Sequence, residues 1–186
     1  MQDESVYLGL GSNVGNRIVH LRAGLAGLRE HGLRLRAISS FYLTEPDLRS
    51  GSGEPVEVVG ANHPWYINCV AAVDGAPAAD QLVELCLAVE HDRGRSRRPT
   101  SEGCGPPEPR VLDVDVLMIG EHIIENSSIC VPHPRMQNRR FVLAPLAEIA
   151  PQARHPVAGE TIGDMLTALP ERERVWLLAP PPGEAG

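Results

Sequence analysis

The sequence contains no lysine: all 17 of its positively charged residues are arginine. This absence excludes chemistry that needs a lysine amine, such as Schiff-base formation or the lysine of a P-loop. Phosphate groups bound by this chain must therefore be held by arginine, backbone amides or a metal ion. Arginine suits that task, because its planar guanidinium forms paired hydrogen bonds with phosphate oxygens.

Cysteine and long apolar runs are also scarce. The four cysteines are far apart and include no C-x-x-C pair, which argues against a metal cluster and indicates a reducing compartment. No apolar run is long enough to span a bilayer, and the opening stretch MQDESVYLGLGSN does not resemble a signal peptide. We therefore expect a cytoplasmic protein without a membrane partner.

Length and charge bound the fold and the partners. The 186 residues carry a formal net charge of −7, which suits one domain and disfavours binding to nucleic acid. We expect residues 1–178 to form this single domain and residues 179–186, APPPGEAG, to form a flexible tail rich in Pro and Gly. We expect the chain to be a monomer, with weak self-association as the alternative.

Helix and strand patterns alternate along the chain. Apolar residues recur at helical spacing in Arg17–Glu30, where Asn16 is a suitable N-cap, and in residues 77–92. Further helices are predicted near residues 138–150 and 162–169, and strands at residues 6–10, 33–45, 65–73, 109–120 and 175–178. The first six elements follow the order β-α-β-β-α-β, which predicts an α+β, ferredoxin-like αβ sandwich. Its antiparallel sheet would have helices on one face and substrate-binding loops on the other.

The stretch PRVLDVDVLMIG, residues 109–120, places two acids in an apolar strand. Strand alternation puts Asp113 and Asp115 on one face, with Cα atoms roughly 7 Å apart. Carboxylates about 5 Å apart repel each other by roughly 3 kcal/mol at an effective dielectric near 20. Solvent, a shared proton or a bound cation could relieve this repulsion, and a cation would do so most strongly. The opposite face would carry Leu112, Val114, Val116 and Met118.

Arginines cluster shortly before this strand, in HDRGRSRR, residues 91–98. Such a run could be a solvated surface. Arginines next to paired carboxylates, however, are typical of sites that hold a polyphosphate through a divalent ion. Mg²⁺ fits, because it prefers oxygen ligands and commonly uses one or two carboxylates, leaving positions for phosphate and water.

Several segments occur in the order found in the 6-hydroxymethyl-7,8-dihydropterin pyrophosphokinase family of folate-pathway enzymes. They are YLGLGSNVGN, SSFYLTEP, YINCV, GRSR, PRVLDVDVLMIG and VPHPRMQNRRFVLAPLAEIAP, and the last two are the most specific. The chain resembles this family from residue 6 to about residue 151. The resemblance implies an enzyme that transfers the terminal pyrophosphate of ATP to the hydroxymethyl group of the pterin and releases AMP.

The resemblance also implies roles for individual residues. Asp113 and Asp115 would hold two Mg²⁺ ions between the triphosphate and the acceptor hydroxyl, and Arg95 and Arg110 would engage the transferring phosphates. The positions that match nucleotide-binding residues of the family are Glu90, Arg97, His133 and Arg139. The positions that match pterin-binding residues are Thr44, Tyr66, Asn68 and Phe141. An aromatic pair provides a slot for a flat heterocycle, and an asparagine amide offers it both a donor and an acceptor.

Two loops depart from the family pattern. Residues 45–65 form a longer connection than usual, and residues 98–109 lack the tryptophan that commonly precedes the aspartate strand. These departures leave open a divergent paralogue that acts on another heterocyclic alcohol. A non-catalytic pterin- or nucleotide-binding module is the alternative from another class, but such a module needs neither aspartate. A dinucleotide-dependent oxidoreductase is disfavoured, because GLGSNVG misses the spacing of G-x-G-x-x-G.

Overall fold

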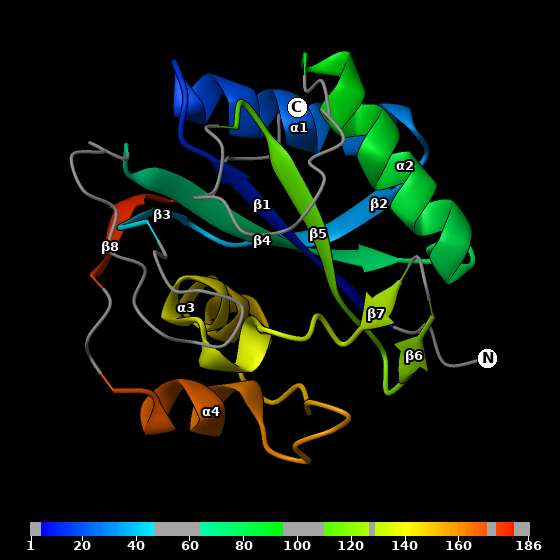
Figure 1. Ribbon diagram of the computed structural model, residues 1–186, viewed down its shortest axis with the longest axis vertical. Coiled ribbons are helices and arrows are strands. Elements are labelled where there is room, and N and C mark those ends of the chain that lie inside the picture. The colour runs from blue at the N-terminus through cyan, green and yellow to red at the C-terminus, as the bar shows by residue number, and fades with distance from the viewer. Residues whose placement is uncertain (1–4, 47–63, 95–109, 127–128, 171–173, 181–186) are drawn as a thin grey trace.

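The computed structural model describes residues 5–46, 64–94, 110–126, 129–170 and 174–180 (Figure 1). Strands and helices alternate in the first half of the chain, and the later helices follow a small two-stranded unit. In chain order the elements are β1 (Val6–Ser12), α1 (Arg17–Glu30), β2 (Arg34–Ile38), β3 (Phe41–Thr44), β4 (Tyr66–Asp74), α2 (Ala79–Asp92), β5 (Asp113–Ile119), β6 (Ile124–Glu125), β7 (Cys130–Val131), a 3₁₀ turn (Met136–Asn138), α3 (Arg140–Ile149), α4 (Ile162–Ala168) and β8 (Val175–Ala179).

Within the described ranges, six strands form one antiparallel sheet. Its order is β5-β1-β4-β3-β8, and β2 pairs with a second stretch of β4. The strands β6 and β7 form a separate two-stranded sheet. The predicted α+β, ferredoxin-like class is confirmed by this arrangement of helices and antiparallel strands.

The helices α1 and α2 cover one face of the sheet (Figure 1). Their apolar residues, such as Leu21 and Leu82, pack in one core with Leu8 and Leu10 of β1. The structure confirms the predicted bounds of α1 and its N-cap, because the Asn16 side chain accepts a hydrogen bond from the Val19 N–H at 3.3 Å. The helix α2 begins at residue 79, two residues later than predicted.

The opposite face carries a second core, formed with α3 and α4 (Figure 1). Leu143 and Leu146 of α3 and Met165 of α4 pack there in one cluster with Tyr7 and Leu117 of the sheet. The expectation that only loops would lie over this face was therefore too simple. The apolar spacing predicts both helices but not their packing, in which α3 lies on the sheet and α4 lies against α3 (Figure 1).

Two strand predictions need correction. The predicted strand at residues 33–45 is interrupted at Ser39 and Ser40, which separate β2 from β3. The Ser39 hydroxyl accepts a hydrogen bond from the Val70 N–H of β4 at 2.9 Å, so a side chain replaces a backbone partner at the break. In β5, the pairing with β1 shifts at Leu117, and Met118 joins the same core as Leu117 rather than the face of Val116.

Two further expectations concern the tail of the chain and the possibility of a helix that crosses a membrane. The strand β8 ends at Ala179, one residue beyond the predicted strand, and residues 181–186 of the expected tail lie outside the described residues. In the part of the chain that the structure describes, no helix has the length and apolar character needed to cross a membrane.

Candidate active site

Asp113 and Asp115 lie on the same face of β5, as the alternation predicts. In the register with β1, Asp113 lies opposite Gly11 and Asp115 lies opposite Gly9. A Cβ atom at Gly11 would lie only 2.6 Å from the side-chain oxygen of Asn68. A Cβ atom at Gly9 would lie 3.3 Å from the Leu117 side chain, so the two glycines let neighbouring side chains approach the backbone of β1 beside the carboxylates.

Arg110 is fixed beside Asp113 by three contacts. Its Nη1 donates to Asp113 Oδ2 at 2.6 Å, and its backbone N–H donates to Asn13 Oδ1 at 2.6 Å. The Asn13 N–H in turn donates to the Arg110 backbone carbonyl at 3.1 Å. Burial lowers the pKa of Arg110, but the charge and hydrogen bond of Asp113, together with the charges of Tyr66 and Asp115, outweigh it and raise the pKa above its ordinary value. The guanidinium is therefore a permanent positive charge at this point.

The pKa of Asp115 is strongly affected by its surroundings. Burial and the charge of Asp113 raise the pKa of Asp115 to about 6, although Arg110 and Arg139 act in the opposite direction. The side chain of Asp113 is only 19% exposed, which disfavours the interpretation of a fully solvated acidic face. The local field therefore favours any added positive charge that reaches both carboxylates.

His133 and Arg139 lie next to the paired acids. The backbone N–H of His133 donates to the Leu117 carbonyl of β5 at 2.8 Å. The ring Nδ1 of His133 accepts from the backbone N–H of Arg135 at 3.2 Å. Burial, Arg139 and Arg135 lower the pKa of His133 to about 4. At neutral pH the ring is therefore uncharged, and its Nε2–H is left to donate. Arg139 precedes α3 and lies with its guanidinium carbon 5.3 Å from the centre of the Phe141 ring.

Three of the predicted pterin-binding residues share the face of the aspartates. Asn68 lies opposite Gly11 in the sheet, and its Nδ2 donates to Thr44 Oγ1 at 2.7 Å. Thr44 pairs with Tyr66, which lies two residues before Asn68 in β4 and therefore on the same face. The fourth, Phe141, lies in the first turn of α3 and packs at the margin of the second core, on the same side of the sheet.

Glu90 has a different position from the other predicted nucleotide-binding residues. Its side chain is on α2, on the opposite face of the sheet, and the residue is only 2% exposed. Its Oε1 accepts a hydrogen bond from the Val114 N–H at 2.8 Å. A direct contact with ATP would require this carboxylate to leave its buried position. Arg95 and Arg97 lie outside the described residues, and their predicted roles stay predictions.

Glu148, which joins α3 to the sheet, is not among the predicted site residues. Its carboxylate accepts hydrogen bonds from the Ser40 N–H at 3.0 Å, the Ser40 hydroxyl at 2.8 Å and the Tyr42 hydroxyl at 2.8 Å. Burial and this contact with Glu148 raise the pKa of Tyr42 to about 12. Glu148 lies two helical turns after Phe141, so it anchors the helix that carries one predicted wall of the pterin slot. The signal in the sequence was that an acid, Glu148, interrupts the otherwise apolar segment PLAEIAP, residues 145–151.

Replacing Glu148 by alanine should lower the free energy of unfolding by about 1–2 kcal/mol, because Ser40 and Tyr42 lose their acceptor at a partly exposed site. Urea unfolding measures this loss. Glu121→Ala, at an exposed turn position, is the matched control and should change the stability little. Equal stabilities of the two variants would contradict the anchoring role.

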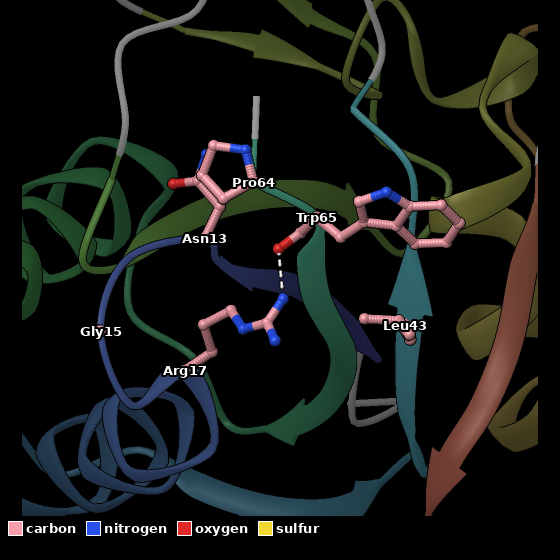
Figure 2. Close-up of a pocket in the computed structure, with 6 residues that line it drawn as sticks. All are labelled: Asn13, Gly15, Arg17, Leu43, Pro64 and Trp65. Atoms are coloured by element: carbon pink, nitrogen blue, oxygen red, sulfur yellow. Dashed lines mark hydrogen bonds between the residues drawn. The ribbon is translucent and has the colours of Figure 1, made fainter. Parts of the chain in front are cut away.

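A hollow of about 510 Å³ lies at the turn between β1 and α1 (Figure 2). It is lined by Asn13, Gly15, Arg17, Leu43, Pro64 and Trp65. Arg17 Nη1 donates to the Trp65 carbonyl at 2.5 Å across it. Leu43 belongs to the core under α1 and α2, and the lining includes neither aspartate. The hollow therefore borders the aspartate site, through Asn13, without being part of it.

The donor set suits an ion that binds together with a phosphate ligand. Among the described residues, no group of three or more His, Cys, Asp or Glu side chains could hold a metal ion. Asp113 and Asp115 alone supply the one or two carboxylates that Mg²⁺ commonly uses. The remaining ligands of such an ion would be phosphate oxygens and water.

Comparisons with known proteins find relatives along most of the chain. Residues 7–151 match the family model described as 7,8-dihydro-6-hydroxymethylpterin-pyrophosphokinase (HPPK). The chain is 35% identical over 168 residues to a 2-amino-4-hydroxy-6-hydroxymethyldihydropteridine pyrophosphokinase of Methylorubrum extorquens, covering 88% of this chain and 92% of the relative. It is 34% identical to the enzyme of that name from Pseudomonas aeruginosa, covering 90% and 93% of the two chains.

A similar fold occurs in a solved structure. The crystal structure of Plasmodium falciparum HPPK-DHPS with pteroate matches with a TM-score of 0.65 and 12% identity. The match covers 89% of this chain and 44% of that one. At this low identity, the likeness concerns the fold alone.

Proposed function

The chain belongs to the 7,8-dihydro-6-hydroxymethylpterin-pyrophosphokinase family, and on this premise we propose which residues perform its reaction. The protein is an ATP-dependent diphosphotransferase of folate biosynthesis. It transfers pyrophosphate from ATP to the hydroxymethyl group of 6-hydroxymethyl-7,8-dihydropterin. In this reaction the hydroxyl oxygen bonds to the β-phosphorus of ATP and loses its proton, and the bond from that phosphorus to the AMP oxygen breaks.

The proposed centre is the pair Asp113 and Asp115, which would hold Mg²⁺ against the triphosphate. Support comes from the shared face of the two acids, the close approach of the Asn68 amide to Gly11 beside them, and the raised pKa of Asp115. Bound Mg²⁺ supplies charge neutralisation and orients phosphate oxygens. The resemblance to the family implies two such ions.

Positive and neutral donors would complete the phosphate site. Arg110, held by Asn13 and Asp113, would stabilise the negative charge on the transferring phosphates. His133 would donate from Nε2 as an uncharged ring, and Arg139 adds charge near Asp115. We propose the same kind of phosphate contact for Arg95 and Arg97. Chemistry of this type depends on positioning and charge more than on a covalent intermediate.

The pterin would lie over the same sheet face, between Tyr66 and Phe141. The hydrogen bond from Asn68 to Thr44 fixes the amide, so that its oxygen is held above Gly11. An oxygen acceptor and the second N–H of the amide suit the donor and acceptor edge of an aminopyrimidinone. A flat heterocycle also fits between two aromatic rings.

The paired aspartates beside Arg110 are the observation that supports this proposal most. The test is an assay that supplies ATP and the hydroxymethyl pterin and separates the products by chromatography. We expect AMP and the pterin diphosphate in equal amounts, and no turnover once EDTA has removed Mg²⁺. Release of ADP, or turnover that survives chelation, would contradict the proposed site.

A further inference from the structure

Glu90 is buried beneath the strand that carries the paired aspartates. It lies in the last turn of α2 and is 2% exposed. A carboxylate at such a position is tolerated only when it is hydrogen-bonded. Its Oε1 accepts from the N–H of Val114 at 2.8 Å, and Val114 is the residue between Asp113 and Asp115. The contact therefore acts on the backbone of the aspartate pair.

The strand β5 lies at an edge of the sheet in the part of the chain that the structure describes. It pairs with β1 on one side. Backbone N–H groups along an antiparallel strand alternate in direction, so that every second one faces away from the partner strand. The Val114 N–H is bonded to Glu90, and the carboxylate takes the place that a carbonyl of a further strand would have.

We infer that Glu90 is a positioning residue for the aspartate pair: by accepting from the Val114 N–H, it holds the edge strand so that both acids face one point. The inference rests on the proposed function, because it gives the pair its metal-binding role. Residues behind metal ligands commonly orient them, and their loss typically costs 10–100-fold in metal affinity or activity. Glu90 would act in this way through the backbone, from the opposite face of the sheet.

Two substitutions separate the hydrogen bond from the charge and the packing. Glu90→Gln keeps an oxygen acceptor of nearly the same shape but removes the charge. Glu90→Met keeps an unbranched chain of similar length but offers only a weak sulfur acceptor. The control is Glu84→Met, at an exposed position of the same helix.

Three measurements apply to each full-length variant. NMR hydrogen exchange reports the Val114 amide, calorimetry reports Mg²⁺ binding with an unreactive ATP analogue, and the assay gives the Mg²⁺ requirement and the KM for pterin. We expect Glu90→Met to lose protection at Val114 and to need about 10-fold more Mg²⁺, with an unchanged pterin KM. Glu90→Gln and Glu84→Met should stay within about twofold of the wild type in Mg²⁺ requirement.

The inference is overturned if Glu90→Met keeps the wild-type exchange and metal affinity, or if Glu90→Gln is impaired as much as Glu90→Met. If Glu90→Met does not fold, Glu90→Gln and the wild type decide: weak Mg²⁺ binding by Glu90→Gln, or an unprotected Val114 amide in the wild type, overturns it. In each of these outcomes the wild-type enzyme still depends on Mg²⁺, so the outcome contradicts the role of Glu90 and leaves the proposed function intact. A wild type that needs no metal would instead contradict the proposed function.

Discussion

Asp115→Asn should abolish turnover while leaving the protein at least as stable as the wild type. The acid is half-buried beside Asp113, and burial together with that neighbouring charge raises its pKa to about 6. Asparagine has nearly the same shape and removes the repulsion, so the empty site loses a source of strain. It also removes one charged oxygen ligand from the proposed metal site. We expect kcat to fall by at least about 10³-fold, because a bound metal ion supplies several kcal/mol of charge stabilisation in the transition state.

Asp113→Asn should be equally inactive but different in stability. Asp113 Oδ2 accepts from Arg110 at 2.6 Å, so this substitution also weakens the contact that holds the arginine. We therefore expect a midpoint of thermal unfolding that is lower than that of Asp115→Asn. Differential scanning calorimetry gives the midpoints, and calorimetric titration with Mg²⁺ and an unreactive ATP analogue gives the metal affinity.

Asp80→Asn is the matched control for both variants, because Asp80 is exposed in the first turn of α2. It should keep wild-type kcat and wild-type metal binding. Substantial activity in both Asp113→Asn and Asp115→Asn would refute the metal-site assignment. A large loss of stability in Asp115→Asn would show instead that the acid supports the fold.

The behaviour of the aspartates could be predicted from the sequence because it depends on local geometry. A two-residue period places Asp113 and Asp115 on one face whatever the rest of the chain does. The bulge at Leu117, which moves Met118 to the other face, depends on the register with β1 and has no local signal. The same holds for Glu90, whose burial follows from the packing of α2 against β5.

The pterin side of the site shows the other limit. Thr44, Asn68 and Tyr66 come together because β3 pairs with β4, and no periodicity within either segment specifies that pairing. Only the resemblance to a known family placed these residues in one site. Of the two loops that depart from the family pattern, residues 98–109 and residues 47–63 of the loop 45–65 also lie outside the described residues. Arg95 and Arg97 are also outside the described residues, so variants of these two arginines must test their predicted phosphate contacts.

Arg110→Ala should lower kcat by about 10²–10³-fold with little change in the KM for pterin, the range seen when one fixed donor to a developing charge is removed. The guanidinium stays charged and is held beside Asp113 by its own backbone contacts with Asn13, so its position does not depend on the pterin. In the empty enzyme Arg110 also occupies one oxygen of Asp113, and an Mg²⁺ ion must compete with it for that acid. Removing the arginine should therefore leave Mg²⁺ affinity equal or higher while turnover falls.

This opposite movement of metal affinity and kcat distinguishes a phosphate-binding arginine from one that merely maintains the site. Arg36→Ala is the matched control, because Arg36 forms an ion pair with Asp74 at 3.0 Å on β2 and β4, outside the aspartate site. Steady-state kinetics give kcat and KM for both variants, and calorimetric titration gives Mg²⁺ binding with an unreactive ATP analogue. If Arg110→Ala weakened pterin and metal binding as much as it lowered kcat, the arginine would be part of the scaffold of the site, and the stabilisation of the transferring group would have to come from another donor.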